Sequence, residues 1–183
     1  MGKVLYYTAC TLDGFIADEA GSLDWLFEVP SSGDDSSWEA FIGRVGALAM
    51  GATTYTWVVE HEALLDHPER WTEWYGDRPC WVFTHRDLPR IRGVDVRFVE
   101  GDVRPVHAEM DATGRDSWVV GGGDLVGQFD DAGLLDEIHL GMCPVTLGAG
   151  APLLPRRITS ERLTLRSVEQ DGQRARLVLD VAR

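Results

Sequence analysis

The stretch WVVGGGDLVGQF, residues 118–129, joins an apolar run to an amphipathic one through three consecutive glycines. Residues 118–120 predict the end of a buried strand, and Leu125, Val126 and Phe129 recur at helical spacing. Glycines at such a junction let the backbone approach a ligand closely, and free N–H groups at a helix N-terminus can donate to phosphate oxygens. The spacing alone fits a phosphate site and a plain tight turn equally well. The stretch lacks the G-x-G-x-x-G fingerprint of dinucleotide-binding folds.

Two further loops carry groups that suit a phosphate. In MGATTY, residues 50–55, Gly51 ends an apolar run and threonines begin the next pattern, whose Thr-rich start predicts a helix N-cap. An ordinary strand–helix turn explains this loop on its own, although two such junctions in one sheet strengthen the phosphate hypothesis for both. The loop THRDLPRIR, residues 84–92, gathers one histidine and three arginines in an acidic chain. It could bind a phosphate monoester, and a solvated basic loop is the alternative.

Composition excludes several classes of protein. The 183 residues are 44% hydrophobic and carry a net charge of −13, which suits one globular domain and gives no support to nucleic-acid binding. No run of about 18 apolar residues predicts a membrane span. The N-terminal residues enter a strand-like run without the organisation of a signal peptide. Three scattered cysteines, Cys10, Cys80 and Cys143, suit the reducing cytoplasm.

The chain alternates predicted strands and helices for about 135 residues and then finishes with strands. The last two strands form a hairpin that turns at Asp171-Gly172. We therefore expect an α/β sheet, largely parallel, with an antiparallel C-terminal edge. Residues 11–26 and 148–155 are expected to be irregular loops. Ligands of such folds bind beyond the carboxyl ends of the parallel strands, where the three loops described above would lie.

Two stretches resemble metal-binding motifs, but neither has a complete or familiar ligand pattern. His107-Ala108-Glu109 matches the start of a zinc deaminase signature, but no P-C-x-x-C follows it, and we exclude a deaminase. His61, Glu62 and His67 match no familiar ligand spacing and indicate a solvated helix face. No metal site is expected.

Six stretches, taken in order along the chain, resemble the dihydrofolate reductase-like superfamily. They are TLDGFIA, GSLDW, MGATTY, WVFTHR, WVVGGGDLVGQF and LDEIHLGMCPVTLGAGAPLL. The similarity is greatest to the reductase domain of the riboflavin-biosynthesis deaminase-reductase, and it covers nearly the whole chain. It implies a three-layer α/β fold in one domain, residues 1–183: a mixed, mainly parallel sheet with an antiparallel C-terminal hairpin and helices on both faces. It also implies that NADPH is the cofactor.

The resemblance assigns the cofactor site residue by residue. The Ala9 backbone would meet the nicotinamide carboxamide, and Ile16 would pack near that ring. Thr84, His85 and Arg86 would surround the 2′-phosphate. The residues implied at the diphosphate are Gly51, Thr53, Thr54, Gly121, Gly122, Gly123, Asp124 and Leu125. One departure matters: the family reads Gly-Arg-x-Thr where this chain has Ala52. The lost cation would weaken NADPH binding by about 1.5–3 kcal/mol, and it leaves the preference for NADPH over NADH open.

The sequence indicates the substrate-binding residues less strongly than the cofactor-binding residues. Asp35 falls at the offset of an acid that contacts the pterin in folate-reducing relatives, and we predict it as the catalytic acid; a helix-capping role is the alternative. Asp13 would line the substrate site or organise its loop. Trp25, Trp38 and Trp57 suit a flat ring, and core packing is the alternative for each.

These observations predict an NADPH-dependent oxidoreductase. Its substrate would be a small heterocycle, a pteridine or 5-amino-6-(5-phosphoribosylamino)uracil type, reduced by hydride transfer. The alternative is a non-catalytic NADP(H)-binding module with a regulatory role. The stretch 136–150 is apolar, and relatives in the family often pair through this region, so a homodimer is expected. Neither nucleic acid nor membrane is an expected partner.

Overall fold

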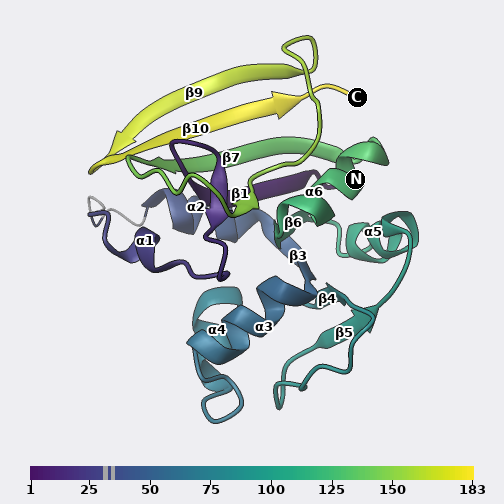
Figure 1. The fold of residues 1–183 in the computed structure, drawn as a ribbon. Helices are drawn as coiled ribbons and strands as arrows, with labels where there is room; N and C mark the ends of the chain where they lie inside the picture. The colour runs from purple at the N-terminus through teal and green to yellow at the C-terminus, as the bar shows by residue number, and fades with distance from the viewer. Residues whose placement is uncertain (31–32, 34–35) are drawn as a thin grey trace.

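The computed structural model describes residues 1–30, 33 and 36–183. Within this part of the chain, eight strands form one sheet in the order β5-β4-β3-β6-β1-β7-β10-β9, and β2 pairs with β8 in a small second sheet (Figure 1). The strands are β1 (Val4–Thr11), β2 (Phe15–Ala17), β3 (Val45–Gly51), β4 (Cys80–Phe83), β5 (Val96–Val99), β6 (Asp116–Gly121), β7 (Leu135–Cys143), β8 (Ala151–Pro152), β9 (Leu163–Asp171) and β10 (Arg174–Val181). The helices are α1 (Asp24–Phe27), α2 (Ser36–Arg44), α3 (Ala52–His61), α4 (Glu69–Tyr75), α5 (Val103–Asp111) and α6 (Gly123–Asp131).

The strands from β5 to β7 pair in parallel, and β10 is antiparallel to both β7 and β9. This confirms the expected mainly parallel sheet with an antiparallel C-terminal hairpin, which lies at one edge of the sheet (Figure 1). Asp171 pairs with Arg174, so the hairpin turns at Gly172 and Gln173, one residue later than predicted. Gly172 has φ +59°, a conformation that glycine adopts without a steric penalty.

Helices cover both faces of the sheet because successive residues of the central strands enter two different cores. Val4 and Tyr6 pack with side chains of α5 and α6, whereas Leu5 between them packs with side chains of α2, α3 and α4. All three β1 residues are fully buried. The alternation of side chains along a strand thus explains the three-layer architecture that the resemblance implied.

Helix α6 shows how the sequence after the glycines forms a regular element. Leu125, Val126 and Phe129 all lie in the core that α6 shares with α5. The helix ends where Gly133, at φ +70°, donates its N–H to the Asp130 carbonyl, and the next residue donates to the Phe129 carbonyl. The predicted helix, ended by Gly133, is confirmed.

Four short elements escaped prediction because they are too short to show periodicity or depend on non-local contacts. The expected loop 11–26 contains β2 and the start of α1, and the expected loop 148–155 contains β8, which pairs with β2. Helix α4 is seven residues long, too short to show helical periodicity, and buried Trp71 anchors it. Among the described residues, no helix is long and apolar enough to cross a membrane.

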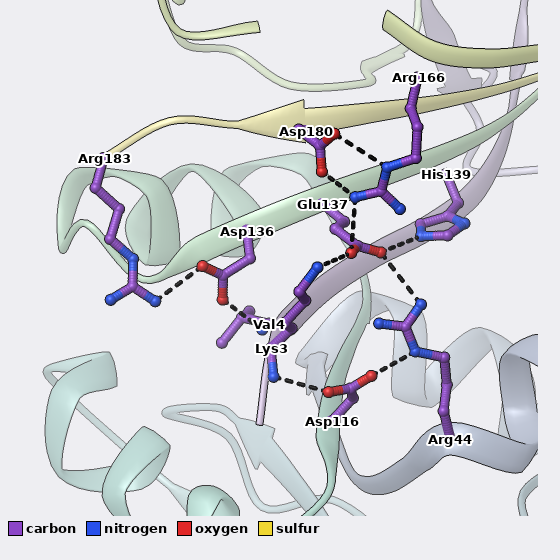
Figure 2. A network of polar contacts seen from close by, with 10 residues as sticks. All are labelled: Lys3, Val4, Arg44, Asp116, Asp136, Glu137, His139, Arg166, Asp180 and Arg183. Atoms are coloured by element: carbon purple, nitrogen blue, oxygen red, sulfur yellow. Dashed lines mark hydrogen bonds and ion pairs between the residues drawn. The ribbon is translucent and has the colours of Figure 1, made fainter. Parts of the chain in front are cut away.

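A buried carboxylate ties the sheet to α2 (Figure 2). Glu137 on β7 is 1% exposed and accepts hydrogen bonds from Lys3 Nζ (2.5 Å), His139 Nε2 (2.9 Å) and Arg166 (2.9 Å), with Arg44 of α2 at 3.3 Å. Burial opposes ionisation, but the hydrogen bonds from His139, Arg166 and Lys3 outweigh it and hold the pKa of Glu137 far below its usual range. The network joins β7, β9 and α2 to Lys3, the residue before β1, and is structural in character.

Candidate functional site

The two glycine junctions predicted from the sequence lie side by side. Strands β3 and β6 are neighbours, and Met50 pairs with Gly121 at their carboxyl ends. A Cβ atom added to Gly51 would lie 3.5 Å from the Gly122 nitrogen, so the two turns are in van der Waals contact. The Gly121–Gly122 peptide bond is cis. The sheet therefore brings two glycine turns from distant parts of the chain to one place on its edge.

Each of these turns leads into the N-terminus of a helix without a side-chain cap. Gly51 precedes α3 and Gly122 precedes α6, and neither helix has a side-chain cap hydrogen bond. The prediction that threonines cap α3 is wrong, because the capping position falls on Gly51. Helix α5 differs, since the Asp102 side chain accepts from the Arg104 N–H at 2.9 Å. The first N–H groups of α3 and α6 are therefore available to an anion.

The three consecutive glycines have different surroundings. A Cβ atom at Gly122 would meet nothing closer than Ile16 Cδ1, at 4.0 Å. At Gly123 it would collide with the carbonyl oxygens of Pro152 and Leu153, at 2.4 and 2.5 Å. Gly123 is therefore required for packing of α6 against the β8 segment, whereas Gly122 keeps the surface beside the turn open.

A cavity of ≈ 280 Å³ adjoins the glycine turns. Tyr7 and Thr8 of β1 line it just past the last β1–β6 pair, Tyr6 with Val119, where β1 continues beside β7 as far as Thr11. The Trp118 indole donates to the Tyr7 carbonyl at 3.1 Å. The lining residues are Tyr7, Thr8, Ile16, Ala17, Gly21, Leu23, Trp38, Thr54, Trp57, Val58, Tyr75, Trp118, Val120 and Gly121.

Several residues predicted for the site line this cavity or adjoin it. Ile16, Trp38, Thr54, Trp57 and Gly121 are among the lining residues, and Gly51 and Gly122 form the adjoining turns. The structure thus brings together residues from the first loop, from α2 and α3, and from the triple glycine. Thr53 lies exposed in the first turn of α3.

Other predicted residues lie elsewhere. Trp25 is 6% exposed and packs with Val29 and Cys143, so it does not line the cavity and the packing alternative is favoured. Ala9 on β1 packs against that same cluster. Leu125 points into the core, and exposed Asp124 contacts Gln128 (3.0 Å) and Arg156 (3.2 Å). Only their main-chain atoms are candidates for a cofactor. Asp35 lies outside the described residues.

Asp13 organises two loops. Its carboxylate accepts from Thr11 Oγ1 (2.6 Å) and from the N–H groups of Leu147 (3.0 Å) and Gly148 (2.7 Å). The Thr11 hydroxyl and the Gly148 N–H lower the pKa of Asp13, so it is ionised at neutral pH. Of the two roles considered from sequence, loop organisation fits these contacts.

The basic loop follows β4 at the same edge of the sheet. The Thr84 hydroxyl accepts from the Arg86 N–H at 2.9 Å and fixes the turn. The His85 ring lies 3.2 Å from Glu100, and both side chains are exposed. Arg86 is exposed and has no carboxylate partner among the described residues, whereas Arg90 donates to the Val96 carbonyl and lies over the Phe98 ring. Arg92 is likewise exposed and without a carboxylate partner in the described part of the chain, so Arg86 and Arg92 are the available cations of this loop.

The sequence did not reveal Tyr7, Tyr75 and Trp118 as cavity residues. Tyr7 and Trp118 looked like ordinary strand residues, and α4, which carries Tyr75, was not predicted. The metal motifs remain unsupported: among the residues described, no group of three or more candidate ligands could hold a metal. Glu109, from the deaminase-like motif, accepts from the Trp81 indole at 3.0 Å.

Comparison with known proteins gives the family. Residues 57–177 match the RibD C-terminal domain. The chain is 32% identical over 176 residues to the uncharacterized protein YwjB of Bacillus subtilis (strain 168), covering 96% of this chain and 95% of that one. A putative riboflavin biosynthesis protein from Shewanella sp. PV-4 is similar in structure, with a TM-score of 0.78 and 26% identity over the full length of both chains.

The fold extends to a dihydrofolate reductase from Enterococcus faecalis, solved in complex with NADP(H). Its TM-score is 0.61 at 15% identity, covering 100% of this chain and 96% of that one. The expected fold is thereby confirmed as one shared with reductases. This chain belongs to the RibD C-terminal domain family and has the dihydrofolate reductase-like fold.

Proposed function

We propose that this chain is an NADPH-dependent reductase that transfers a hydride to a small heterocycle, of pteridine or 5-amino-6-(5-phosphoribosylamino)uracil type. One observation carries the proposal: two uncapped helix N-termini and two glycine turns meet beside an aromatic cavity. A diphosphate requires donors that no side chain covers, and a flat ring requires apolar walls.

The residues present fit the cofactor. Open space at Gly122 and the uncapped starts of α3 and α6 suit a diphosphate. We assign this group to the main chain of residues 51–54 and 121–125, with the Thr54 hydroxyl beside it. The exposed His85 and Arg86 side chains, on the loop that Thr84 fixes, suit the 2′-phosphate, and Ile16 and the Ala9 backbone would flank the nicotinamide.

When bound, NADPH would supply the hydride. The chain supplies orientation: Trp38 and Trp57 wall the cavity from α2 and α3, and Asp13 holds the loop that contributes Ile16. The aromatic walls would shield the reacting atoms from water on the sides that they line. A proton must also reach the product anion, and Asp35 stays the predicted donor.

The direct test combines NADPH binding, by calorimetry, with NADPH oxidation in the presence of pteridines and ribosylaminopyrimidines. Binding with turnover supports the proposal. Tight binding without turnover on any acceptor favours the alternative, a regulatory NADP(H)-binding module. If NADPH does not bind, both readings fail.

The proposed assembly is a homodimer. Leu165 and Val168 on β9 are 55% and 58% exposed, and their cross-strand partners Leu179 and Leu177 are two residues apart on β10. The four side chains therefore share one face of the hairpin, which a second copy would cover. A double substitution, Leu165→Lys with Val168→Lys, should halve the mass measured by light scattering. A wild-type chain that is already monomeric would refute the dimer.

The proposed compartment is the cytoplasm. Cys10, Cys80 and Cys143 are free thiols and all three are buried. Burial raises the pKa of Cys10 to about 11, which keeps that thiol protonated and unreactive. Buried, unpaired thiols suit a reducing compartment.

A further inference from the structure

The walls of the cavity beside the glycine turns consist of aromatic and aliphatic groups. Five aromatic side chains contribute to it: Tyr7, Trp38, Trp57, Tyr75 and Trp118. Among the described residues that line the cavity, none carries a formal charge at neutral pH. The basic side chains of the loop after β4, His85 and Arg86, are not lining residues.

The rings support one another and so hold the shape of the cavity. Trp38 contacts Trp118 edge-to-face at 5.5 Å between ring centroids, and Tyr7 contacts Trp38 at 5.6 Å. Trp57 stacks on His61 at 4.4 Å, and His61 stacks in turn on Phe27 of α1 at 5.2 Å. The stack links α3 to α1, the helix that follows the lining residues Gly21 and Leu23. A rigid aromatic cavity selects flat rings by shape.

Size and charge both act against a phosphorylated substrate. The cavity, at ≈ 280 Å³, lies just below the range of typical ligand pockets, roughly 300–1,000 Å³. It suits a one- or two-ring system better than a ring with a phosphoribosyl group. The described lining residues offer no cation, and Arg176, in a second cavity that shares Tyr7, is already paired with Asp171 at 2.8 Å. A phosphate drawn in with the ring would therefore lose hydration without gaining a free cation, and such burial is unfavourable.

Three hydroxyl groups on the lining residues, those of Tyr7, Thr54 and Tyr75, have no hydrogen-bond partner among the described residues. Thr54 lies beside the Gly121 turn, where its hydroxyl is assigned to the diphosphate, and Tyr7 also lines a second cavity beside Arg176. Tyr75 is therefore the best candidate to orient the ring. We propose, on the basis of the reductase function above, that the cavity takes an uncharged flat ring. Its carbonyl or ring nitrogen would accept a hydrogen bond from Tyr75, and the phosphorylated form of the same substrate would bind more weakly.

Tyr75 is suited to this role because it stays a neutral donor. Burial, with Cys80 and Glu62 nearby, raises the pKa of Tyr75 well above its usual value. Its hydroxyl therefore keeps its proton over the whole physiological range of pH, so it can donate to a carbonyl oxygen. Of the two substrate types considered above, the cavity therefore favours the pteridine, which carries no phosphate.

The test is a binding measurement that needs no turnover. Tryptophan fluorescence of the full chain is titrated with lumazine, and with 5-amino-6-ribosylaminouracil with and without its 5′-phosphate. Trp38, Trp57 and Trp118 in the walls should report binding. We expect lumazine to quench, and the unphosphorylated uracil to bind about tenfold more tightly than its phosphate. Equal or tighter binding of the phosphate overturns the inference.

Two variants sharpen the result. Tyr75→Phe keeps the ring and removes the hydroxyl, and should weaken lumazine binding about 3- to 10-fold with an unchanged melting temperature. Leu23→Lys places a cation on the cavity wall and should improve binding of the phosphate selectively. Leu12→Lys, at a residue that is 62% exposed and outside the lining, makes the same charge change and should have no such effect. Unaltered affinities in both Tyr75→Phe and Leu23→Lys contradict the inference.

Failure of this inference and failure of the reductase function are distinguishable. If lumazine binds as expected but no acceptor supports NADPH oxidation, the cavity assignment stands and the reductase function falls. If NADPH is oxidised with the phosphorylated substrate in preference, the reductase function stands and the inference falls.

Discussion

Replacing Gly122 separates cofactor binding from folding. Gly122 has φ −80° and ψ −179°, a conformation open to any L-residue, and an added Cβ atom would meet nothing within 4.0 Å except Ile16 Cδ1. Gly122→Ala should therefore fold normally. The new methyl group would occupy the space in which the diphosphate approaches the uncapped end of α6, and Gly122→Val would fill it further.

The magnitude follows from the hydrogen bonds that the substitution displaces. A hydrogen bond to a charged group contributes about 1.5–3 kcal/mol, so losing one should raise the NADPH dissociation constant roughly 10- to 150-fold. We expect Gly122→Ala near the lower figure and Gly122→Val beyond detection. The measurement is calorimetric titration with NADPH, beside a thermal melt of each variant.

Two other glycines supply the controls. Gly43 in α2 also has nothing within 4 Å of an added Cβ atom and lies away from the turns, so Gly43→Ala should change neither binding nor stability by much. Gly123→Ala should lower the melting temperature, because its Cβ atom would lie 2.4 Å from the Pro152 oxygen. NADPH affinity unchanged in Gly122→Val would refute the phosphate role of this turn.

Three further predictions concern charge and stacking. Arg86→Ala should weaken NADPH about tenfold and leave NADH unchanged, because only NADPH has the 2′-phosphate; equal losses in titrations with both nucleotides would exclude that contact. His61→Ala removes both ring contacts of the Phe27–His61–Trp57 stack and should raise KM with little change in kcat, whereas His67→Ala, at an exposed residue that contacts Glu69, should change neither; a matching KM change in both variants would contradict the stack's role. Glu137→Gln leaves Lys3, Arg44 and Arg166 without their shared carboxylate and should lower the free energy of unfolding by about 3 kcal/mol at pH 7, measured by urea denaturation. Because folding depresses the pKa of Glu137, its contribution is complete above the unfolded value near 4.5 and is lost as the pH falls toward the folded value, so wild type and variant should converge in acid; a constant difference would contradict this linkage.

Local signals in the sequence predicted the elements around the glycine turns well. A glycine between an apolar run and a helical pattern marks a strand–helix junction whatever surrounds it, so both junctions were found. That Gly51 and Gly122 touch could only be anticipated from the resemblance, since it depends on β3 and β6 becoming neighbours. Residues 51 and 122 are far apart in the chain, and no periodicity encodes their pairing.

The residues that line the cavity were harder to predict, because they depend on how the neighbouring strands β1 and β6 pair and where that pairing ends. Tyr7 lines the cavity just past the last β1–β6 pair, Tyr6 with Val119, whereas Trp118 pairs with Leu5 and donates its indole N–H to the Tyr7 carbonyl. Trp25 and Trp38 looked equivalent in sequence, yet one packs in a core cluster and the other forms a wall. An aromatic residue suits both environments, so the sequence could not distinguish them.

The missing arginine at Ala52 illustrates how the fold can compensate for a lost side chain. The N-terminus of a helix carries the equivalent of about half a positive charge, so α3 and α6 together present about one unit at the point where their turns meet. That is comparable in magnitude to the absent guanidinium, and it is fixed in the backbone. No acidic residue stands in the first turn of α3, and exposed Asp124 at the start of α6 is paired with Arg156. The two helix ends therefore offset part of the acidity of a chain of net charge −13, so Ala52 is compatible with the proposed binding of a diphosphate by the backbone.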